Sequence, residues 1–239
     1  MRLDRLVGEV LSSRARAREA IAQGRVKVNG APVRDGAFNA SEHDAITLDG
    51  AAIGKRETLH LMLHKPAGCV TAREDAHFST VFDLLPPSFR TSELSAVGRL
   101  DRDVTGLLLM TEDGQLAHRL ISPRFEVQKV YLARVEGRLT GADVPRMAEG
   151  LELHDFTARP ARLEILEASD AFSTALLTVH EGKFHQVKRM FAALGHPVET
   201  LHRQSVGGVA LDPALPPGGY RKLMPEEIAH LYALTEMSP

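Results

Sequence analysis

The chain has 239 residues, of which 44% are hydrophobic, so it can bury one sizeable core and a small second one. Its single cysteine, Cys69, excludes an intramolecular disulfide framework and a cysteine-rich zinc site. The sequence has neither an apolar run of about 18 residues nor an N-terminal apolar signal core, so we expect a cytoplasmic protein without a membrane span.

The net charge of −2 hides an asymmetry between residues 1–34 and the rest of the chain. Eight basic side chains stand against three acidic ones in residues 1–34, a net charge of +5, which leaves −7 for the remainder. A small basic head on an acidic body is typical of a protein that binds a polyanion, although a solvated helix face would look the same. The basic residues of the head are Arg2, Arg5, Arg14, Arg16, Arg18, Arg25, Lys27 and Arg34.

The basic head has the pattern of a compact folded module. Its apolar spacing predicts an amphipathic helix over residues 2–11. Ser12 and Ser13 can cap a second helix, which Gly24 ends. Residues 25–33 alternate around an Asn-Gly dipeptide, which predicts a β-hairpin. We therefore expect residues 1–48 to form a small domain and residues 49–58, which lose periodicity, to form a linker.

The rest of the chain, residues 59–239, is predicted to form a second, larger domain. Strand character is found at 59–64, 106–111, 129–136, 161–167 and 174–180, and helical character at 114–121, 142–149, 186–194 and 225–234. These strands and helices do not alternate regularly. We therefore expect an α+β fold, with a mostly antiparallel mixed sheet flanked by helices.

Asp101 is the strongest candidate for a reactive group. It lies in a turn after Gly98, and an uninterrupted apolar run typical of a buried strand follows at 107–110. A carboxylate at the mouth of such a strand can be held in place and partly desolvated, with Arg99 and Arg102 as nearby cations. The same position would also suit an ordinary turn or capping residue.

Four motifs along the chain, in order, resemble those of pseudouridine synthases. The head, through residues 13–30, is similar to the S4 RNA-binding domain, in which a helix pair and a hairpin present arginines to an RNA backbone. Together these features resemble the RsuA branch of the family, which modifies ribosomal RNA. The four motifs are His64–Gly68, Arg99–Leu108, Lys129–Leu132 and Gly182–Phe191.

The resemblance implies that uridine is isomerised to pseudouridine without a cofactor or metal. Asp101 would act on the ribose as nucleophile or electrostatic partner, and Tyr131 would stack on the flipped base. Lys188 would be the basic partner of the aspartate, with Arg189 as the alternative that the sequence leaves open. Asp103 is expected to point elsewhere, as a turn or surface residue, with a supporting role as the alternative. The sequence also leaves open whether the aspartate attacks the sugar or the base.

The resemblance further implies contacts with RNA. Arg99 would fill the space that the flipped uridine leaves, or hold a phosphate, while His185 and Gln186 would contact the backbone or a base edge. The motif around Lys65 is expected to be structural. The full set of expected RNA-binding residues is Arg2, Arg5, Arg14, Arg16, Arg18, Arg25, Lys27, Arg99, His185, Gln186 and Arg189.

Within the branch, four segments look most like the enzymes that act on the small subunit, so we expect 16S ribosomal RNA as the substrate and a monomeric enzyme. A large-subunit (23S) enzyme of the same branch remains an alternative, as does a non-catalytic RNA-binding factor for ribosome assembly. An RNA glycosidase or nuclease is a further alternative, which metal dependence would favour. The segments are Val33–Phe38, Glu42–Asp44, Gly150–His154 and Phe191–Arg203.

Overall fold

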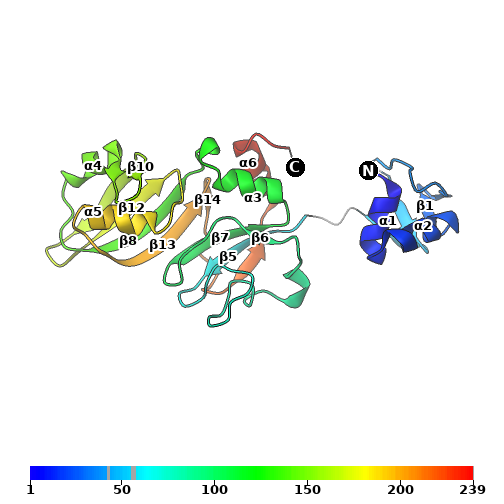
Figure 1. Ribbon diagram of the computed structural model, residues 1–239, viewed down its shortest axis with the longest axis horizontal. Helices are drawn as coiled ribbons and strands as arrows, with labels where there is room; N and C mark the ends of the chain where they lie inside the picture. Colours follow the sequence, from blue (N-terminus) through cyan, green and yellow to red (C-terminus); the bar gives the residue numbers. More distant parts are fainter. Residues whose placement is uncertain (42–43, 55–57, 239) are drawn as a thin grey trace. The chain divides into compact units, whose positions relative to one another are not determined.

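The computed structural model describes residues 1–41, 44–54 and 58–238. The chain divides into two compact units, Met1–Glu57 and Thr58–Pro239 (Figure 1). Two parts of the sequence analysis lie outside the described residues: Glu42 and His43 of the segment compared with small-subunit enzymes, and residues 55–57 of the expected linker. None of the described helices is long and apolar enough to cross a membrane.

The first unit packs two helices against a small sheet. Helices α1 (Leu3–Leu11) and α2 (Arg14–Ala22) form where predicted, and the Ser13 side chain caps α2 by accepting from the backbone N–H of Arg16 at 3.4 Å. The hairpin of β1 (Val26–Val28) and β2 (Ala31–Pro32) turns at two residues of positive φ, Asn29 and Gly30, as a type I′ turn requires.

The linker prediction was partly wrong, because the second of two further strands of this sheet lies within residues 49–58. The two strands are β3 (Ile46–Leu48) and β4 (Ala51–Ala52), and the strand order is β2-β1-β3-β4. The next residue, Ile53, packs into the core of the unit. Residues 49–53 therefore belong to the first unit. The sequence did not reveal this, because a two-residue strand followed by one buried apolar residue is too short to show periodicity.

The second unit is built on one large sheet with strand order β11-β12-β8-β13-β7-β5-β15. Neighbouring strands on this path are antiparallel except β13 and β7, which are parallel, so the predicted mostly antiparallel mixed sheet is confirmed. Strands β6 and β14 pair with β7 and β13 off this path, and β9 pairs separately with β10. The bounds are β5 His60–Lys65, β6 Ser95–Ala96, β7 Thr105–Thr111, β8 Lys129–Glu136, β9 Leu151–Glu152, β10 Thr157–Ala158, β11 Arg162–Ala168, β12 Phe172–Val179, β13 Val198–Val206, β14 Val209–Ala210 and β15 Tyr220–Lys222.

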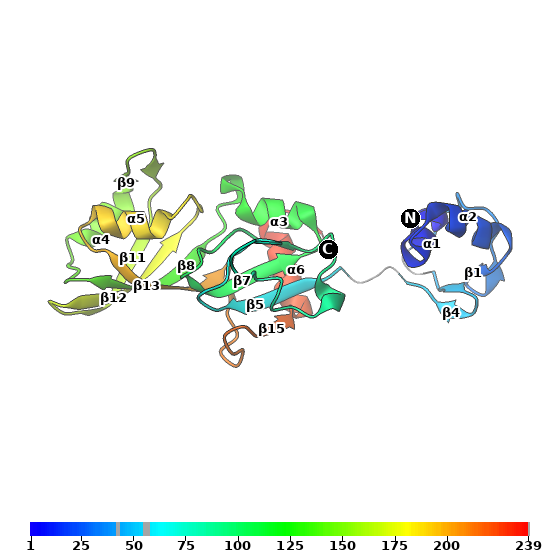
Figure 2. The ribbon, with the colours of Figure 1, turned by 60° about the horizontal axis from the view of Figure 1, so that its bottom comes forward.

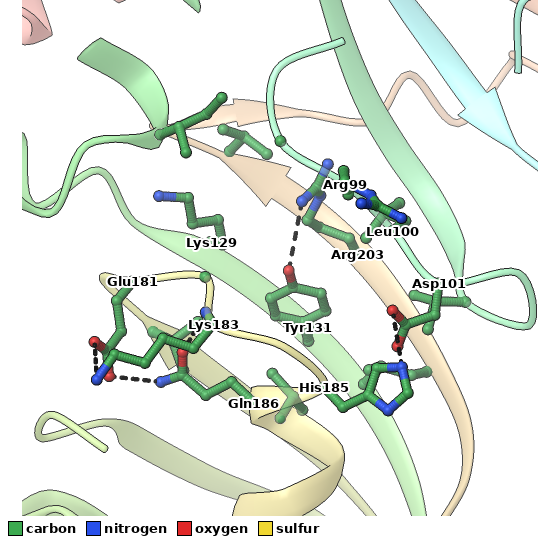
Figure 3. A pocket seen from close by; sticks show the side chains of 18 of the residues that line it. Arg99, Leu100, Asp101, Lys129, Tyr131, Glu181, Lys183, His185, Gln186 and Arg203 are labelled. Atoms are coloured by element: carbon green, nitrogen blue, oxygen red, sulfur yellow. Dashed lines mark hydrogen bonds and ion pairs between the residues drawn. The ribbon is translucent and has the colours of Figure 1, made fainter. Parts of the chain in front are cut away.

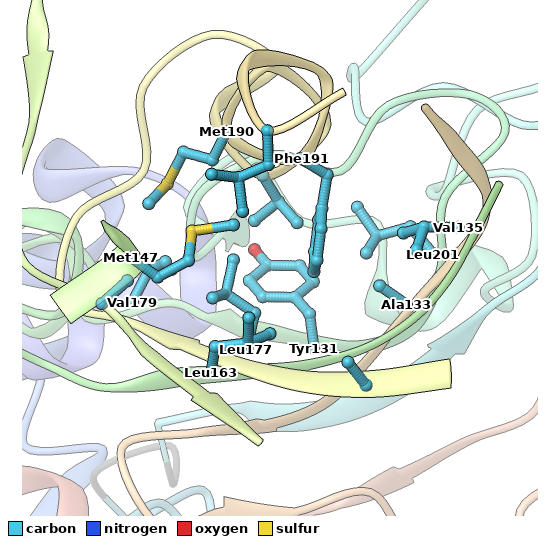
Figure 4. Close-up of a cluster of buried hydrophobic side chains, with 14 of the residues drawn as sticks. Tyr131, Ala133, Val135, Met147, Leu163, Leu177, Val179, Met190, Phe191 and Leu201 are labelled. Carbon is cyan, nitrogen blue, oxygen red and sulfur yellow. The ribbon is translucent and has the colours of Figure 1, made fainter. Parts of the chain in front are cut away.

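Different helices cover the two halves of the sheet (Figure 2). Helices α4 and α5 pack on the half formed by β8, β11, β12 and β13, where Met190 and Phe191 of α5 belong to one apolar cluster with Tyr131 and Leu177 (Figure 4). Helices α3 and α6 pack on the other half, around β7 and β5. The bounds are α3 Gly114–Ile121, α4 Asp143–Glu149, α5 Gln186–Ala193 and α6 Pro225–Leu234, with short 3-10 helices at Pro87–Phe89 and Pro123–Phe125.

Strand β7 is buried on both faces, which explains its uninterrupted apolar run. Leu107 and Leu109 pack with α3 and α6, whereas Leu108 and Met110 pack with the long segment between β5 and β6. The strand that follows Asp101 is thus enclosed on both sides and provides a rigid base for the loop that carries the carboxylate.

The parallel seam between β7 and β13 requires a glycine. Gly106 is paired with Arg203, has a φ of +109°, and a Cβ added to it would lie 2.3 Å from the Arg203 carbonyl oxygen. A side chain at this position is excluded both by its conformation and by the neighbouring backbone. The close approach brings β13, with Arg203, against the strand that begins just after Asp101.

Candidate active site

A pocket opens on the second unit over the middle of the sheet (Figure 3). Its walls come from the loop before β7, the end of α3, the start of β8, the connection from β12 to α5, and β13. It holds about 750 Å³ of empty space, a volume that includes its open mouth. Six residues of the sequence prediction line it: Arg99, Asp101, Tyr131, His185, Gln186 and Lys188.

Asp101 receives its basic neighbours from α5. The Lys188 ammonium lies 3.4 Å from one carboxylate oxygen, and His185 Nε2 lies 3.4 Å from the other. Arg99 and Arg102, the candidate cations next to Asp101 in the chain, form no ion pair with it among the described residues. The Arg102 guanidinium lies instead over the Phe78 ring, 4.3 Å from its centre.

Asp103 converges on the same lysine, which corrects the expectation that it points elsewhere. Its two carboxylate oxygens accept hydrogen bonds from Lys188 Nζ at 2.7 and 2.8 Å, and this bonding lowers the pKa of Asp103. The backbone N–H of Val104 donates to the Asp101 carbonyl at 3.2 Å, so the chain turns between the two aspartates. Asp103 remains a surface residue, with its side chain 71% exposed.

Arg189 is held away from Asp101. Its guanidinium forms an ion pair with Asp155 and lies 4.8 Å from the centre of the Phe156 ring. The same ion pair lowers the pKa of Asp155. Of the two alternatives that the sequence left open, the structure therefore brings Lys188 to the aspartate, because successive helix residues point in different directions.

The loop that carries Asp101 is anchored from beneath by Lys65. This lysine is fully buried at the end of β5, and its ammonium donates to the carbonyls of Val104 at 2.8 Å, Pro66 at 3.0 Å and Arg102 at 3.3 Å. Burial lowers the pKa of Lys65. On the other side of Asp101, the Thr71 hydroxyl donates to the Leu100 carbonyl at 2.8 Å. The loop is thus fixed on both flanks of the carboxylate.

Tyr131 lies at the centre of the pocket beside two cations that the sequence analysis did not single out. Its hydroxyl accepts a hydrogen bond from Arg203 Nη1 at 3.4 Å (Figure 3). Lys129 precedes it by two residues on the same face of β8 and is 7% exposed. Burial, followed by repulsion from Arg203, lowers the pKa of Lys129 to about 8. The period of two in β8 was the available signal, since it places Lys129 on the inward face with Tyr131.

The start of α5 forms the rim of the pocket. His185 has a left-handed conformation, φ +50°, and its ring stacks at 3.8 Å on that of Phe184, which is 76% exposed. Gln186 lines the pocket but does not lie on the outer surface. It is 4% exposed, donates to Glu181 at 2.8 Å and accepts from the Lys183 backbone N–H at 3.0 Å. Its amide holds the connection between β12 and α5 because the first turn of the helix faces the core.

The basic residues of the first unit lie on its surface. Arg2 pairs with Asp4 at 2.9 Å and Arg25 with Asp49 at 2.5 Å. Other cations have no ion pair with any residue that the structure describes, among them Arg14, Arg16 and Lys27. The seven predicted RNA-binding residues of this unit, Arg2, Arg5, Arg14, Arg16, Arg18, Arg25 and Lys27, are all exposed.

Comparison with known proteins gives concordant results for both units. The family model for RNA pseudouridylate synthase matches residues 59–193, and that for the S4 domain matches residues 1–46. The ribosomal small subunit pseudouridine synthase A of Escherichia coli (strain K12) is 43% identical over 237 residues, 96% of this chain and 99% of the relative. The protein of that name from Vibrio parahaemolyticus serotype O3:K6 is 41% identical over 231 residues, 95% and 98% of the two chains. A crystal structure of a pseudouridylate synthase superposes with a TM-score of 0.68 at 38% identity, over 97% of this chain and 99% of the other.

Proposed function

Because the chain belongs to the family of RNA pseudouridylate synthases, we propose that it converts a uridine of 16S ribosomal RNA to pseudouridine, with Asp101, Tyr131 and Lys188 as its catalytic residues. The observation that carries the assignment of residues is their convergence in one pocket, where Lys188 lies 3.4 Å from the Asp101 carboxylate. Fold alone would not support it, since function depends on the site.

The reaction would begin when the target uridine leaves its stack and enters the pocket. Asp101 then faces C1′ of the ribose as the bond from C1′ to N1 of the base breaks, and the bonding electron pair stays with the base. The freed base turns so that C5 forms the new bond to C1′. C5 then loses its proton and N1 gains one, which balances an isomerisation.

The neighbours of Asp101 support this role. Lys188 orients the carboxylate and offsets its charge, and Lys65 holds the loop beneath it. Tyr131 offers an aromatic face to the base and a hydroxyl at its tip. Among the alternatives, a non-catalytic assembly factor would have no use for a carboxylate held in this way.

RNA would be bound by both units, with the first unit as the RNA-binding domain and the second as the catalytic domain. The exposed cations of the first unit suit contacts with phosphates. At the rim of the pocket, Arg99, Phe184 and His185 suit contact with unstacked nucleotides next to the target.

The choice of 16S over 23S ribosomal RNA rests on the small-subunit relatives, which are about two-fifths identical over nearly their whole length. We place the enzyme in the cytoplasm, with its substrate, and propose that it acts as a monomer.

The test is pseudouridine mapping on 16S and 23S RNA, by carbodiimide labelling and primer extension. We expect one stop, in 16S RNA, with the wild-type protein and none with Asp101→Asn, whose RNA affinity should stay within a few-fold. Asp170→Asn, at a carboxylate 93% exposed, is the matched control and should keep the stop. A stop in 23S RNA would overturn the choice of subunit. No stop in either RNA, with binding intact, would favour the assembly factor.

A further inference from the structure

The wall of the pocket carries two buried cations that no acidic group in the described part of the chain neutralises. Arg203 is 3% exposed and Lys129 is 7% exposed, and neither forms an ion pair with any described residue. The other lysines of the pocket are paired: Lys188 with Asp101 and Asp103, and Lys183 with Glu181 at 3.8 Å. Burial of an unpaired charge is costly, so a pair of such charges indicates a site for a negatively charged or strongly polar group.

Arg203 has hydrogen-bonding capacity to spare. Its Nε donates to the Leu107 carbonyl at 2.8 Å and its Nη1 to the Tyr131 hydroxyl at 3.4 Å. Its Nη2 is buried without a hydrogen-bond partner among the described residues. Buried donors are almost always satisfied, so an unpaired guanidinium nitrogen in the wall of a pocket points to a ligand as its partner.

Lys129 completes the arrangement from the neighbouring strand. Its ammonium donates to the carbonyls of Val127 at 2.8 Å and Leu120 at 3.3 Å, and a third N–H remains. It lies close enough to Arg203 for the two charges to repel, and both line the pocket around Tyr131 (Figure 3). The two side chains therefore hold fixed donors in place before any substrate enters.

We propose that Arg203 and Lys129 bind the carbonyl oxygens of the reacting uracil and stabilise the negative charge that the base acquires while it is detached from the ribose. The proposal rests on the proposed function, because that reaction leaves the electron pair of the broken bond from C1′ to N1 on the base. Conjugation spreads this pair onto O2 and O4, where preorganised N–H donors stabilise it without reorganisation. The charge is discharged when C5 bonds to C1′, and Arg203 and Lys129 keep their own protons throughout.

Position favours the uracil over a backbone phosphate as the ligand. Arg203 hydrogen-bonds to the hydroxyl of Tyr131, the residue proposed to stack on the base, and so lies beside the ring rather than at the mouth. The cations suited to phosphate are those at the exposed surface, such as Arg99.

The experiment compares leaving groups. Wild type, Arg203→Met, Arg203→Lys and Lys129→Met are assayed in single turnover on 16S RNA containing either uridine or 5-fluorouridine. The C-glycoside is separated from the N-glycoside as a nucleoside by chromatography before mass spectrometry, because the isomerisation of uridine changes no mass. With 5-fluorouridine C5 has no proton to lose, so water adds at C6 after the new C5–C1′ bond forms and the hydrated C-glycoside is the product that is measured. Fluorine stabilises the detached base by itself. With uridine, we therefore expect Arg203→Met and Lys129→Met to react on the order of 10²-fold more slowly than wild type. With 5-fluorouridine, the loss of rate should be only about tenfold. RNA affinity should stay within a few-fold, and Arg203→Lys should recover part of the rate.

Controls separate this inference from the proposed function and from simple misfolding. Arg162→Met, which removes an arginine 80% exposed in its side chain, should behave as wild type. If Arg203→Met unfolds, Lys129→Met and Arg203→Lys still give the comparison of leaving groups. Equal losses of rate with both bases would overturn the uracil site. A loss of RNA affinity with a weaker salt dependence would also overturn it and would indicate that the two cations bind a phosphate. Normal rates in Arg203→Met and Lys129→Met would overturn it while leaving the proposed function intact, whereas an inactive wild type would overturn both.

Discussion

The basic side chains of the first unit and three buried ones in the second unit are of the same chemical kinds but lie in opposite environments. In the first unit they are exposed, and several pair with acidic neighbours, as Arg2 does with Asp4. In the second unit Lys65, Lys129 and Arg203 are buried and bonded largely to backbone carbonyls. Exposed charges attract RNA of any sequence and are screened by salt, whereas buried charges act on one bound group at fixed geometry.

The largest effect is expected where the sheet creates the buried environment. Gly106→Ala would place a methyl group 2.3 Å from the Arg203 carbonyl oxygen, at a φ of +109°. We expect it to destabilise the second unit by about 3–5 kcal/mol, because the seam must open. Gly114→Ala, where a Cβ would meet nothing within 4 Å, is the matched control. Amide hydrogen exchange measures the effect, because it reports the stability of the two units separately. Unchanged protection of β7 and β13 in Gly106→Ala would show that the seam is not strained.

The next effect separates the two ion pairs of Lys188, one with Asp101 in the pocket and one with the exposed Asp103. Lys188→Met should lower the single-turnover rate by roughly 10²–10³-fold, since it removes the ammonium 3.4 Å from the carboxylate. Asp103→Asn should cost no more than a few-fold, because exposed ion pairs contribute little. Comparable losses in the two variants would mean instead that Lys188 acts through Asp103.

The pH dependence of the free energy of unfolding distinguishes a buried lysine from an exposed one. The pKa of Lys129 is about 8 in the folded protein, below the value of about 10.4 in an unfolded chain. Between these values the unfolded state binds more protons, so the free energy of unfolding should rise with pH, by about 3 kcal/mol in all.

Urea unfolding from pH 8 to 10.5 measures this rise. Lys129→Met should reduce it to the part that the lowered pKa of buried Lys65 contributes, whereas Lys27→Met, at an exposed site in the first unit, should keep the full rise. If the rise is undiminished in Lys129→Met, another group is responsible.

The smallest effect concerns the exposed charges. Replacing Arg14, Arg16 and Arg18 by alanine removes three exposed charges. It should weaken RNA binding and flatten the plot of log affinity against log salt concentration by about 2–3 units. Replacement of Arg138 and Arg162 in the second unit serves as the comparison and should change the slope less. If the triple replacement leaves the slope unchanged, the first unit does not bind phosphates through helix α2, which carries these three arginines.

Local pattern alone predicted much of the architecture. The cap at Ser13, the turn at Asn29 and Gly30, and the apolar run of β7 depend on neighbouring residues in the chain, and each element formed where expected. Two-residue strands such as β4 escaped because so short a segment has no measurable period. The ordered motifs were sufficient to indicate the family.

The sequence by itself thus determined the elements, the fold class, the family resemblance and the candidate aspartate. Only the tertiary structure decided that Lys188 rather than Arg189 reaches Asp101, and that Asp103 shares that lysine. It also turned Gln186 inward and buried Lys129 and Arg203 around Tyr131. The reason is physical: these contacts join residues far apart in the chain, and their geometry is set by strand register and by the close approach at Gly106, which no local periodicity encodes.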